Sequence, residues 1–397
     1  PKDAKTHVNL GAILCDRKHD YDRAIDCFKK ALELNPKEAL AHNNLGVALG
    51  HKGDADGAIA CWRQAIEFDP KLATAHDKLG QALHTKGDLD GAIRCFKKVI
   101  ALNPKDVQAH GNLGLALCAK GDMDGAITCW HKALELDPKL ATTHYNLGIA
   151  LYAKHDVKGA IAYYKKAISL DPKYAEAHCN LGHVLRQQGH FTEAVTYLRR
   201  GHEFGSERPG WRYSSAQWLR EAERQAALAR KLSDVLRGDA SPANPGEAAT
   251  LAQMGARYKK CHVAAARLYA GAFAADPKLA ADWNSQHRYN AARGAALAAA
   301  GQGADARLLP DKVVTMFRRW ALTWLRDDLA NYVKLAEQNN PQTRQIIQQR
   351  LAQWRRDADF ASVRELSALD RLGDNERAAW QALWREVDEL AKRVANK

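Results

Sequence analysis

Hydrophobic and small residues recur along the first half of the chain in stripes at helical spacing. Leu45 and Leu49 lie one turn apart, and Ala58, Trp62 and Ala65 form a second stripe at spacings of four and three. Spacings of three and four place side chains on one face of a helix. The pattern therefore predicts two amphipathic helices in this stretch, one after the other.

Breaker residues separate the stripes. Gly53 tolerates a positive φ and ends the first predicted helix, while Asp69-Pro70 ends the second. A Pro-Lys pair then recurs with a fixed step of 34 residues, at Pro36-Lys37, Pro70-Lys71, Pro104-Lys105, Pro138-Lys139 and Pro172-Lys173. Because a single helix pair buries its apolar face only against its neighbours, this period predicts an α-solenoid with a long concave surface.

The same frame carries a Leu-Gly pair early and an aromatic residue late in each period, as at Leu79-Gly80 with Phe96 and Leu113-Gly114 with Trp130. These residues resemble the tetratricopeptide repeat, and the resemblance covers residues 3 to about 204. It implies a right-handed all-α solenoid of six helix pairs. The first repeat holds one extra residue near Arg17-Lys18-His19, so we expect a looser turn there.

The regularity ends after the sixth repeat, and we predict three regions. Residues 1–204 form the array, residues 205–247 a junction with a helix from about Ser214 to Leu236 and a flexible stretch, and residues 248–397 a helical domain that is partly repeat-like. The last region keeps the interval from Gly294 to Gly301 and ends in a stripe of aromatic residues. We interpret that stripe as core packing, because no basic groove accompanies it as a nucleotide-stacking surface would require.

Charge and composition narrow the classes of partner. The formal charge of +13 is spread along the chain, whereas a nucleic-acid footprint is normally a dense basic stripe. No apolar run approaches the length that spans a bilayer. We therefore expect protein or peptide partners, with no nucleic acid and no membrane.

Histidine and cysteine each recur at one repeat position. Cys27, Cys61, Cys95 and Cys129 lie one period apart, too far from each other for disulfides, and buried free thiols fit a reducing cytoplasm. For the histidines we predict a structural role, packing between helices with one ring nitrogen bonded, because repeats are too far apart to share a metal ion. This ladder consists of His7, His42, His76, His110, His144 and His178.

A polar ladder two residues further on is the main candidate for binding. It consists of Asn9, Asn44, Asn112, Asn146 and Asn180, interrupted by Lys78. An amide offers a donor and an acceptor together and can pair with the backbone of an extended peptide. The ladder resembles that of the O-GlcNAc transferase superhelix, which implies a peptide-binding groove; the alternative is that Asn bridges neighbouring helices.

Residues one turn further along the same helices are candidates for selectivity: His84, Tyr152, His183 and Arg186. No catalytic motif, cofactor motif or metal site is present in the sequence. The one local concentration of polar residues in the C-terminal region is His262, Asp282, His287 and Arg288, and unrecognised enzyme activity there is an alternative.

Segments such as Ala264-Ala265-Ala266-Arg267-Leu268-Tyr269 and Arg288-Tyr289-Asn290-Ala291-Ala292 are similar to the C-terminal region of bacterial serine/threonine kinases that carry tetratricopeptide repeats. Pro1-Lys2 stands near the place of the later Pro-Lys pairs, so we expect the chain to be part of a longer protein. The kinase motifs are not in this sequence. We predict a non-catalytic scaffold or regulatory module that binds an extended peptide; the alternative from another class is self-assembly into a homo-oligomer.

Overall fold

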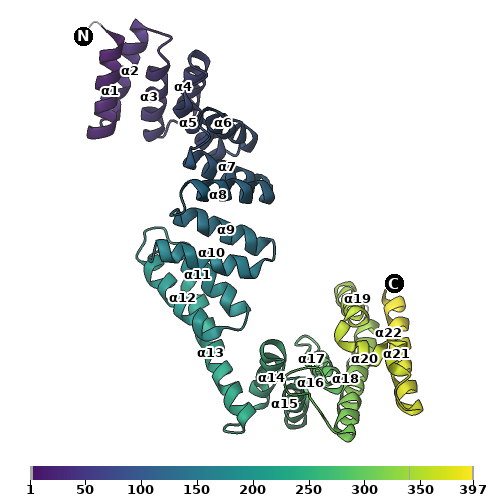
Figure 1. The fold of residues 1–397 in the computed structure, drawn as a ribbon. Coiled ribbons are helices and arrows are strands. Elements are labelled where there is room, and N and C mark those ends of the chain that lie inside the picture. Colours follow the sequence, from purple (N-terminus) through teal and green to yellow (C-terminus); the bar gives the residue numbers. More distant parts are fainter. Residues whose placement is uncertain (1–2, 339, 396–397) are drawn as a thin grey trace. The chain divides into compact units, whose positions relative to one another are not determined.

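The computed structural model describes residues 3–338 and 340–395, and these residues form helices without a strand (Figure 1). They divide into two compact units. The N-terminal unit contains the residues up to Leu185 together with Thr196–Trp218, and the C-terminal unit contains Arg186–Val195 and the residues from Leu219 onward. The predicted all-α class is confirmed.

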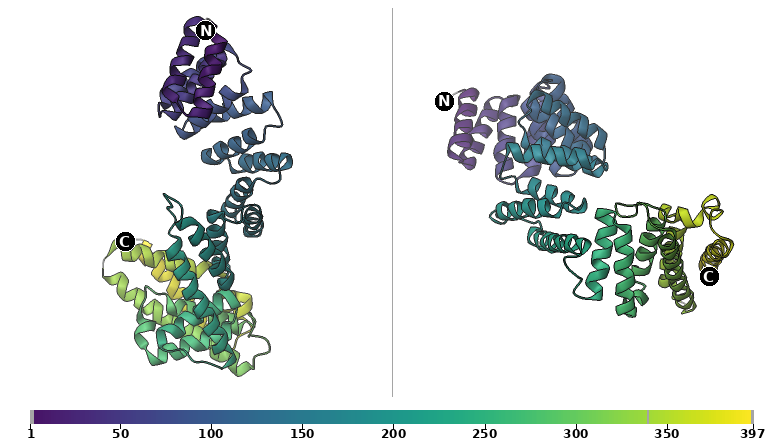
Figure 2. Two further views of the ribbon diagram at one scale, coloured as in Figure 1. Left: turned by 90° about the vertical axis from the view of Figure 1, so that its left-hand side faces the viewer. Right: turned by 60° about the horizontal axis from the view of Figure 1, so that its bottom comes forward.

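The helices of the N-terminal unit follow one another as antiparallel pairs, visible in Figures 1 and 2. The first helix of each pair packs on the second, and the second packs on the first helix of the next pair from α2 to α9. The bounds are α1 Ala4–Lys18, α2 Tyr21–Leu34, α3 Ala39–His51, α4 Ala55–Phe68, α5 Ala73–Thr85, α6 Leu89–Leu102, α7 Val107–Lys120, α8 Met123–Leu136, α9 Ala141–Ala153, α10 Val157–Leu170, α11 Ala175–Gln187 and α12 Phe191–Ser206.

Local sequence explains where these helices begin and end. The Asp88 side chain accepts a hydrogen bond from the backbone N–H of Gly91 at 2.8 Å, which caps the start of α6. Gly53 and Gly121 follow α3 and α7 with φ values of 86° and 92°. After α1 the corresponding left-handed residue is His19, with φ 52°. The extra residue of the first repeat is thus accommodated without glycine.

The core of each pair is an aromatic ring packed over a glycine. A Cβ atom added to Gly46 would lie 2.7 Å from Nε1 of Trp62, and one added to Gly80 would lie 2.8 Å from Cε1 of Phe96. Both rings are buried, and the Trp62 indole N–H donates to the carbonyl of Asn43 at 3.2 Å. The Leu-Gly motif of the sequence therefore exists because only glycine leaves room for the ring.

Ion pairs link the first five repeats along the exposed surface. Each joins a lysine at the end of a first helix to an aspartate 30 residues earlier, and Lys120 lies 2.6 Å from Asp90. The other pairs are Lys52–Asp22, Lys86–Asp56 and Lys154–Asp124. The side chains are largely exposed, so each pair stabilises the array only weakly.

The C-terminal unit contains longer and less regular helices. Its bounds are α13 Ser215–Arg237, of which the first turn belongs to the N-terminal unit, α14 Pro245–Met254, the π-helix η1 Gly255–Lys259, α15 His262–Ala275, α16 Pro277–Ala281, α17 His287–Ala299, α18 Asp311–Glu337, α19 Pro341–Arg356, the 3-10 helix η2 Ala358–Phe360, α20 Ala361–Arg364, α21 Leu366–Leu369 and α22 Asp374–Ala395. The predicted junction helix is α13. The predicted domain limits and the flexibility after Gly238 stay predictions.

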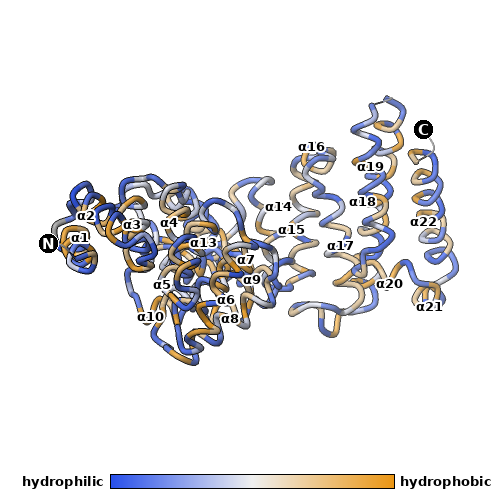
Figure 3. The backbone as a smooth tube through the Cα atoms, turned by 90° about the horizontal axis from the view of Figure 1, so that it is seen from above, coloured by the Kyte–Doolittle hydropathy of each residue, from blue (hydrophilic) through white to orange (hydrophobic). Residues whose placement is uncertain are grey.

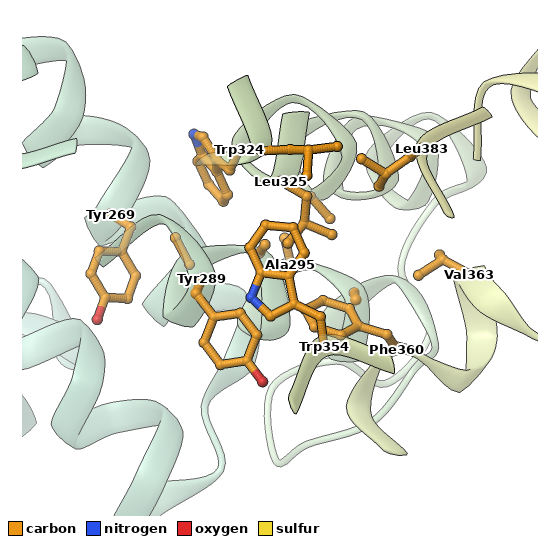
Figure 4. Close-up of a cluster of buried hydrophobic side chains, with 14 of the residues drawn as sticks. Tyr269, Tyr289, Ala295, Trp324, Leu325, Trp354, Phe360, Val363 and Leu383 are labelled. Atoms are coloured by element: carbon orange, nitrogen blue, oxygen red, sulfur yellow. The ribbon is translucent and has the colours of Figure 1, made fainter. Parts of the chain in front are cut away.

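The aromatic stripe forms the core of this unit (Figure 4). Phe317, Trp354 and Trp380 are fully buried, and the rings of Tyr289 and Trp354 stack with centroids 5.9 Å apart. α17 packs on α15 and α18, while α19 and α22 pack on each other. The prediction that these aromatic residues serve packing is confirmed.

Hydrophobic and hydrophilic residues alternate along the helices in Figure 3. Within residues 3–338 and 340–395, no helix combines the length and the hydrophobicity needed to cross a membrane. The eight cysteines are free thiols. Of the four at the repeated position, Cys95 is buried and Cys27, Cys61 and Cys129 are half-buried, so the repeated position is at the border of the core.

Candidate functional site

The predicted ladder lies on the first helix of successive pairs. Asn9 on α1 and Lys78 on α5 are exposed, whereas the other four members are half-buried. These are Asn44 on α3, Asn112 on α7, Asn146 on α9 and Asn180 on α11. The helical repeat places one such residue on each pair because the period is constant.

A polar cavity of about 550 Å³ gathers three of the predicted residues. Lys78 and His84 come from α5, and Asn112 comes from α7. Its polar lining also includes Asp77, Gln81, Thr85 and Gln108. This volume lies within the range of ordinary ligand sites, and the groups that line it include both hydrogen-bond donors and acceptors.

Asp77 is the centre of the hydrogen bonds in this cavity. Its carboxylate accepts from Nε2 of Gln81 at 2.7 Å and from Nδ2 of Asn112 at 3.3 Å. Asn112 therefore bridges α7 to α5, which is the alternative role that we considered for the ladder. Sequence reasoning missed Asp77, which directly precedes the ladder residue Lys78 in the chain.

At the end of the array, two predicted residues contact tyrosine or tryptophan side chains of the same chain. Nδ2 of Asn180 donates to the hydroxyl of Tyr145 at 3.1 Å, and the Tyr145 hydroxyl lies 3.4 Å from that of Tyr213. The ring of His183 lies 6.0 Å from that of Trp218. Burial, together with the neighbouring Tyr213, raises the pKa of Tyr145 well above its usual value. His183 is thus in contact with Trp218 of α13, and Asn180 is linked to Tyr213 only through Tyr145. Sequence reasoning missed these contacts.

The last two predicted residues lie apart from the cavity. Tyr152 is half-buried near the end of α9. Arg186 belongs to the C-terminal unit, where its Nη1 donates to Oε1 of Gln225 on α13 at 3.4 Å. Of the ten predicted residues, three line one cavity, while Asn180 and His183 contact Tyr145 and Trp218, respectively.

Five of the six ladder histidines have the predicted structural role. Nε2 of His42 donates to the carbonyl of Pro36 at 2.9 Å, and Nε2 of His110 donates to that of Pro104 at 3.0 Å. His76, His144 and His178 make the same bond to Pro70, Pro138 and Pro172. Burial lowers the pKa of His178. In the part of the chain that the structure describes, no group of three or more His, Cys, Asp or Glu side chains is placed to hold a metal ion.

The four polar residues noted in the C-terminal region separate into different environments. Arg288 lies 3.4 Å from the carboxylate of Asp328, which is 2% exposed. Burial raises the pKa of Asp328 to about 6, although Arg288 opposes the shift. His262 instead lines a separate cavity. Asp282 accepts a hydrogen bond from the backbone of Asn284, at the turn before α17.

Comparison with solved structures finds helical repeat proteins. MamA is 29% identical, with 40% of this chain and 93% of that chain covered and a TM-score of 0.38. PilF of Pseudomonas aeruginosa is 19% identical over 56% of this chain and 97% of that chain, with a TM-score of 0.48. YrrB, described as a TPR protein with an unusual peptide-binding site, is 20% identical over 50% and 97%, with a TM-score of 0.41.

No curated protein matches the chain significantly. A family model described as TPR repeat matches residues 18–53, 51–87, 80–119, 114–155 and 150–189. A second model, described as Tetratricopeptide repeat, matches residues 175–204. Most of the matched segments contain the second helix of one pair and the first helix of the next, as 18–53 contains α2 and α3, whereas 175–204 contains the pair α11 and α12. Residues 18–204 of this chain are therefore tetratricopeptide repeats, an architecture that serves as a scaffold for protein interactions.

Proposed function

We propose that the chain is a non-catalytic scaffold whose first helices bind an extended peptide. The single observation that carries this proposal is the polar cavity lined by Lys78, His84 and Asn112. Its groups come from two neighbouring repeats, so a peptide that crosses it contacts both. Amide and carboxylate groups pair with peptide N–H and C=O groups, and this pairing requires no particular side-chain sequence.

The cavity also suggests a preference among peptides. Lys78 is exposed at a position where most repeats have asparagine, and its ammonium group favours an acidic side chain. Asp77 is already hydrogen-bonded to Gln81 and Asn112. We infer that the peptide carries an acidic residue that lies next to Lys78, with its backbone along Asn112.

The extent of the site follows from the contacts at the end of the array. Asn180 and His183 contact Tyr145 and Trp218, respectively. The proposed site therefore runs over α1 to α9, along Asn9, Asn44, Lys78, Asn112 and Asn146, and excludes α11. Tyr152 lies at its edge, and Arg186 is outside it.

The test is a selection of peptides from a phage-displayed library on the full chain, followed by fluorescence anisotropy of the selected peptides. Lys78→Ala combined with Asn112→Ala removes one charge and one amide from the cavity. We expect the double variant to bind a selected peptide at least about tenfold more weakly, the loss that corresponds to one charge-assisted hydrogen bond.

The matched control removes the same kinds of group from second helices. Gln64→Ala and Lys98→Ala change an amide on α4 and a lysine on α6, both exposed. This control should bind like the wild type. Equal binding by both double variants, with both folded by circular dichroism, would place the peptide elsewhere and refute the proposal.

A second candidate function, self-association, is favoured by exposed apolar residues on α1. Leu10 is 43% exposed and Ile13 is 48% exposed. Exposed apolar groups of this kind mark contact surfaces when they lie together. Light scattering should show a multimer that Leu10→Ser with Ile13→Ser reduces to a monomer; a monomeric wild type would rule out this function.

Association with a serine/threonine kinase remains a proposal based on the resemblance of residues 251–292. Under this proposal the repeats hold a substrate or regulator for the kinase, and the bound segment is the peptide described above. Phosphorylation by a kinase joined to this chain should then be faster for a peptide that binds α1 to α9. An equal rate for a peptide that does not bind would contradict the role.

A further inference from the structure

The C-terminal unit contains a cavity of about 810 Å³ that lies outside the tetratricopeptide repeats. Residues of α14, η1, α15, α17 and η2 line it, together with Lys260 and the loop between α17 and α18. The volume is in the range of sites that take a small organic molecule. The proposed peptide site on α1 to α9 does not use any of these residues.

Glycine residues explain why this space is open and how its wall is built. Gly294 on α17 lines the cavity, and a Cβ atom added there would meet only the carbonyl oxygen of His262 at 3.8 Å. Gly303 has φ 112°, and a Cβ atom there would lie 2.7 Å from Cδ2 of His262. The loop is held in place because the N–H of Ala304 donates to the carbonyl of Lys260 at 2.8 Å. Because Gly303 has no side chain, the backbone of this loop packs closely against the imidazole of His262 and forms one side of the cavity.

Two residues that line this cavity carry a buried polar atom without a hydrogen-bond partner among the described residues. The hydroxyl of Tyr269 makes no hydrogen bond within the described residues, and the side chain is 1% exposed. Figure 4 shows this oxygen directed away from the aromatic core. Nδ1 of His262 is also unpartnered, and this residue is 7% exposed. Since buried polar groups are almost always bonded, both indicate a missing partner in the cavity.

The charges of the lining are strongly unequal. Arg257, Lys260 and Arg307 are exposed at its edge, and none of them forms an ion pair with an acid of the described residues. Arg293 is held by Asp357 at 3.0 Å and by Asp359. Asp359 is the single acidic residue of the lining. Three cations therefore remain without a counter-ion around one opening.

We propose that this cavity binds a small phosphorylated molecule. Arg257, Lys260 and Arg307 hold the phosphate, because guanidinium and ammonium groups form charge-assisted hydrogen bonds with its oxygens. The uncharged part of the molecule enters beside Gly294 and bonds to Tyr269 and His262. Burial keeps the pKa of His262 low, so its ring at neutral pH offers one donor and one acceptor to that part.

The test is isothermal titration calorimetry of the full chain with AMP, glucose 6-phosphate and inorganic phosphate, and with adenosine and glucose as uncharged counterparts. We expect one of the two phosphate esters to bind at least about tenfold more tightly than its uncharged counterpart. Failure of all three phosphate compounds to bind at millimolar concentration would overturn the proposal. A phosphoserine peptide that binds while both esters fail would overturn it as well.

Variants localise the site. Arg307→Gln should weaken binding of the phosphate ester at least about tenfold. Arg319 is an exposed arginine of α18 outside the cavity, so Arg319→Gln should leave the affinity for the ester unchanged. Tyr269→Phe keeps the buried ring and removes the hydroxyl. It should weaken binding of the ester and leave binding of inorganic phosphate unchanged. Equal losses for Arg307→Gln and Arg319→Gln would mean nonspecific attraction by the net positive charge and would overturn the assignment.

Discussion

The repeats and the C-terminal unit use glycine in opposite ways. In the repeats, Gly46 and Gly80 lie under Trp62 and Phe96, and a single added Cβ would collide with the ring. Gly294 stands in a helix at the same seven-residue distance from a following glycine, but no aromatic ring covers it. One arrangement yields a packed core, and the other leaves an open cavity. The difference shows that a repeat-like sequence does not ensure a repeat-like core.

If the aromatic rings fill the space over the glycines of the array, removing one ring should open a cavity there like the cavity beside Gly294. Trp130 is 2% exposed, and its indole N–H donates to the carbonyl of Gly111. Trp130→Ala should lower the free energy of unfolding by about 3–5 kcal/mol, as for other buried aromatic residues. Urea unfolding followed by circular dichroism measures it. Added indole should restore part of the loss; a loss below about 1 kcal/mol would contradict the packed-core account.

Burial of charge also distinguishes the C-terminal unit, where Asp328 is buried beside Arg288. Its pKa is about 6 in the folded state and about 3.9 in an unfolded chain. The folded state therefore retains the proton to higher pH, and the stability that Asp328 contributes falls as pH rises from about 4 to about 6. Two pKa units correspond to about 3 kcal/mol.

Asp328→Asn provides the measurement, because it removes this titration and keeps the shape. The free energy of unfolding of the wild type minus that of the variant should decrease by about 2–3 kcal/mol between pH 4 and pH 6.5. Titrations that both proteins share, such as those of the histidine ladder, cancel in this difference. A constant difference across the range would show that the carboxyl group of Asp328 titrates normally.

The two kinds of glycine should respond differently to the same substitution. Gly80→Ala places a methyl group against the Phe96 ring and should cost about 1–2 kcal/mol, after allowance for the better helix propensity of alanine. Gly294→Ala meets no side chain and should be neutral or stabilising by up to about 1 kcal/mol. Urea midpoints of the two variants test the contrast. Equal effects would show that the space over Gly294 is filled.

The smallest expected effect concerns the exposed ion pairs between repeats. Hydrogen bonding from Lys120 lowers the pKa of Asp90. In Lys120→Met this pKa should rise to the usual aspartate range, and NMR titration of the Asp90 carboxyl carbon measures the change. The urea midpoint should remain that of the wild type, because exposed pairs stabilise little. An unchanged pKa would mean that the pair does not form in solution.

Much of the array could be predicted from sequence because its contacts are local. The Leu-Gly pair, the late aromatic residue and the closing proline lie within one period, and each determines a contact with its own or the next repeat. The bond from His110 to the carbonyl of Pro104 spans six residues. Local patterns of this kind repeat in the sequence and can be recognised there.

The candidate sites could be predicted only in part. Lys78 and Asn112 are equivalent to other ladder residues in sequence, but the structure brings these two and His84 to one cavity. Tyr213 contacts Tyr145, which lies 68 residues earlier in the chain, and no periodic pattern in the sequence predicts such a contact. The ladder can thus be assigned from sequence to a set of helices, whereas which of its residues meet in one cavity depends on contacts outside the period. Its role in binding stays a prediction.

The sequence by itself determined the helix pairs, their caps and the aromatic core of each repeat, because 34-residue spacing and helix periodicity are properties of neighbouring residues. The tertiary structure alone decided which polar groups meet. Gly294, Tyr269 and Arg307 come from three segments of the C-terminal unit, and their shared cavity results from the packing of α15, α17 and the loop after α17. Such sites depend on contacts between segments distant in the chain, and these leave no periodic pattern.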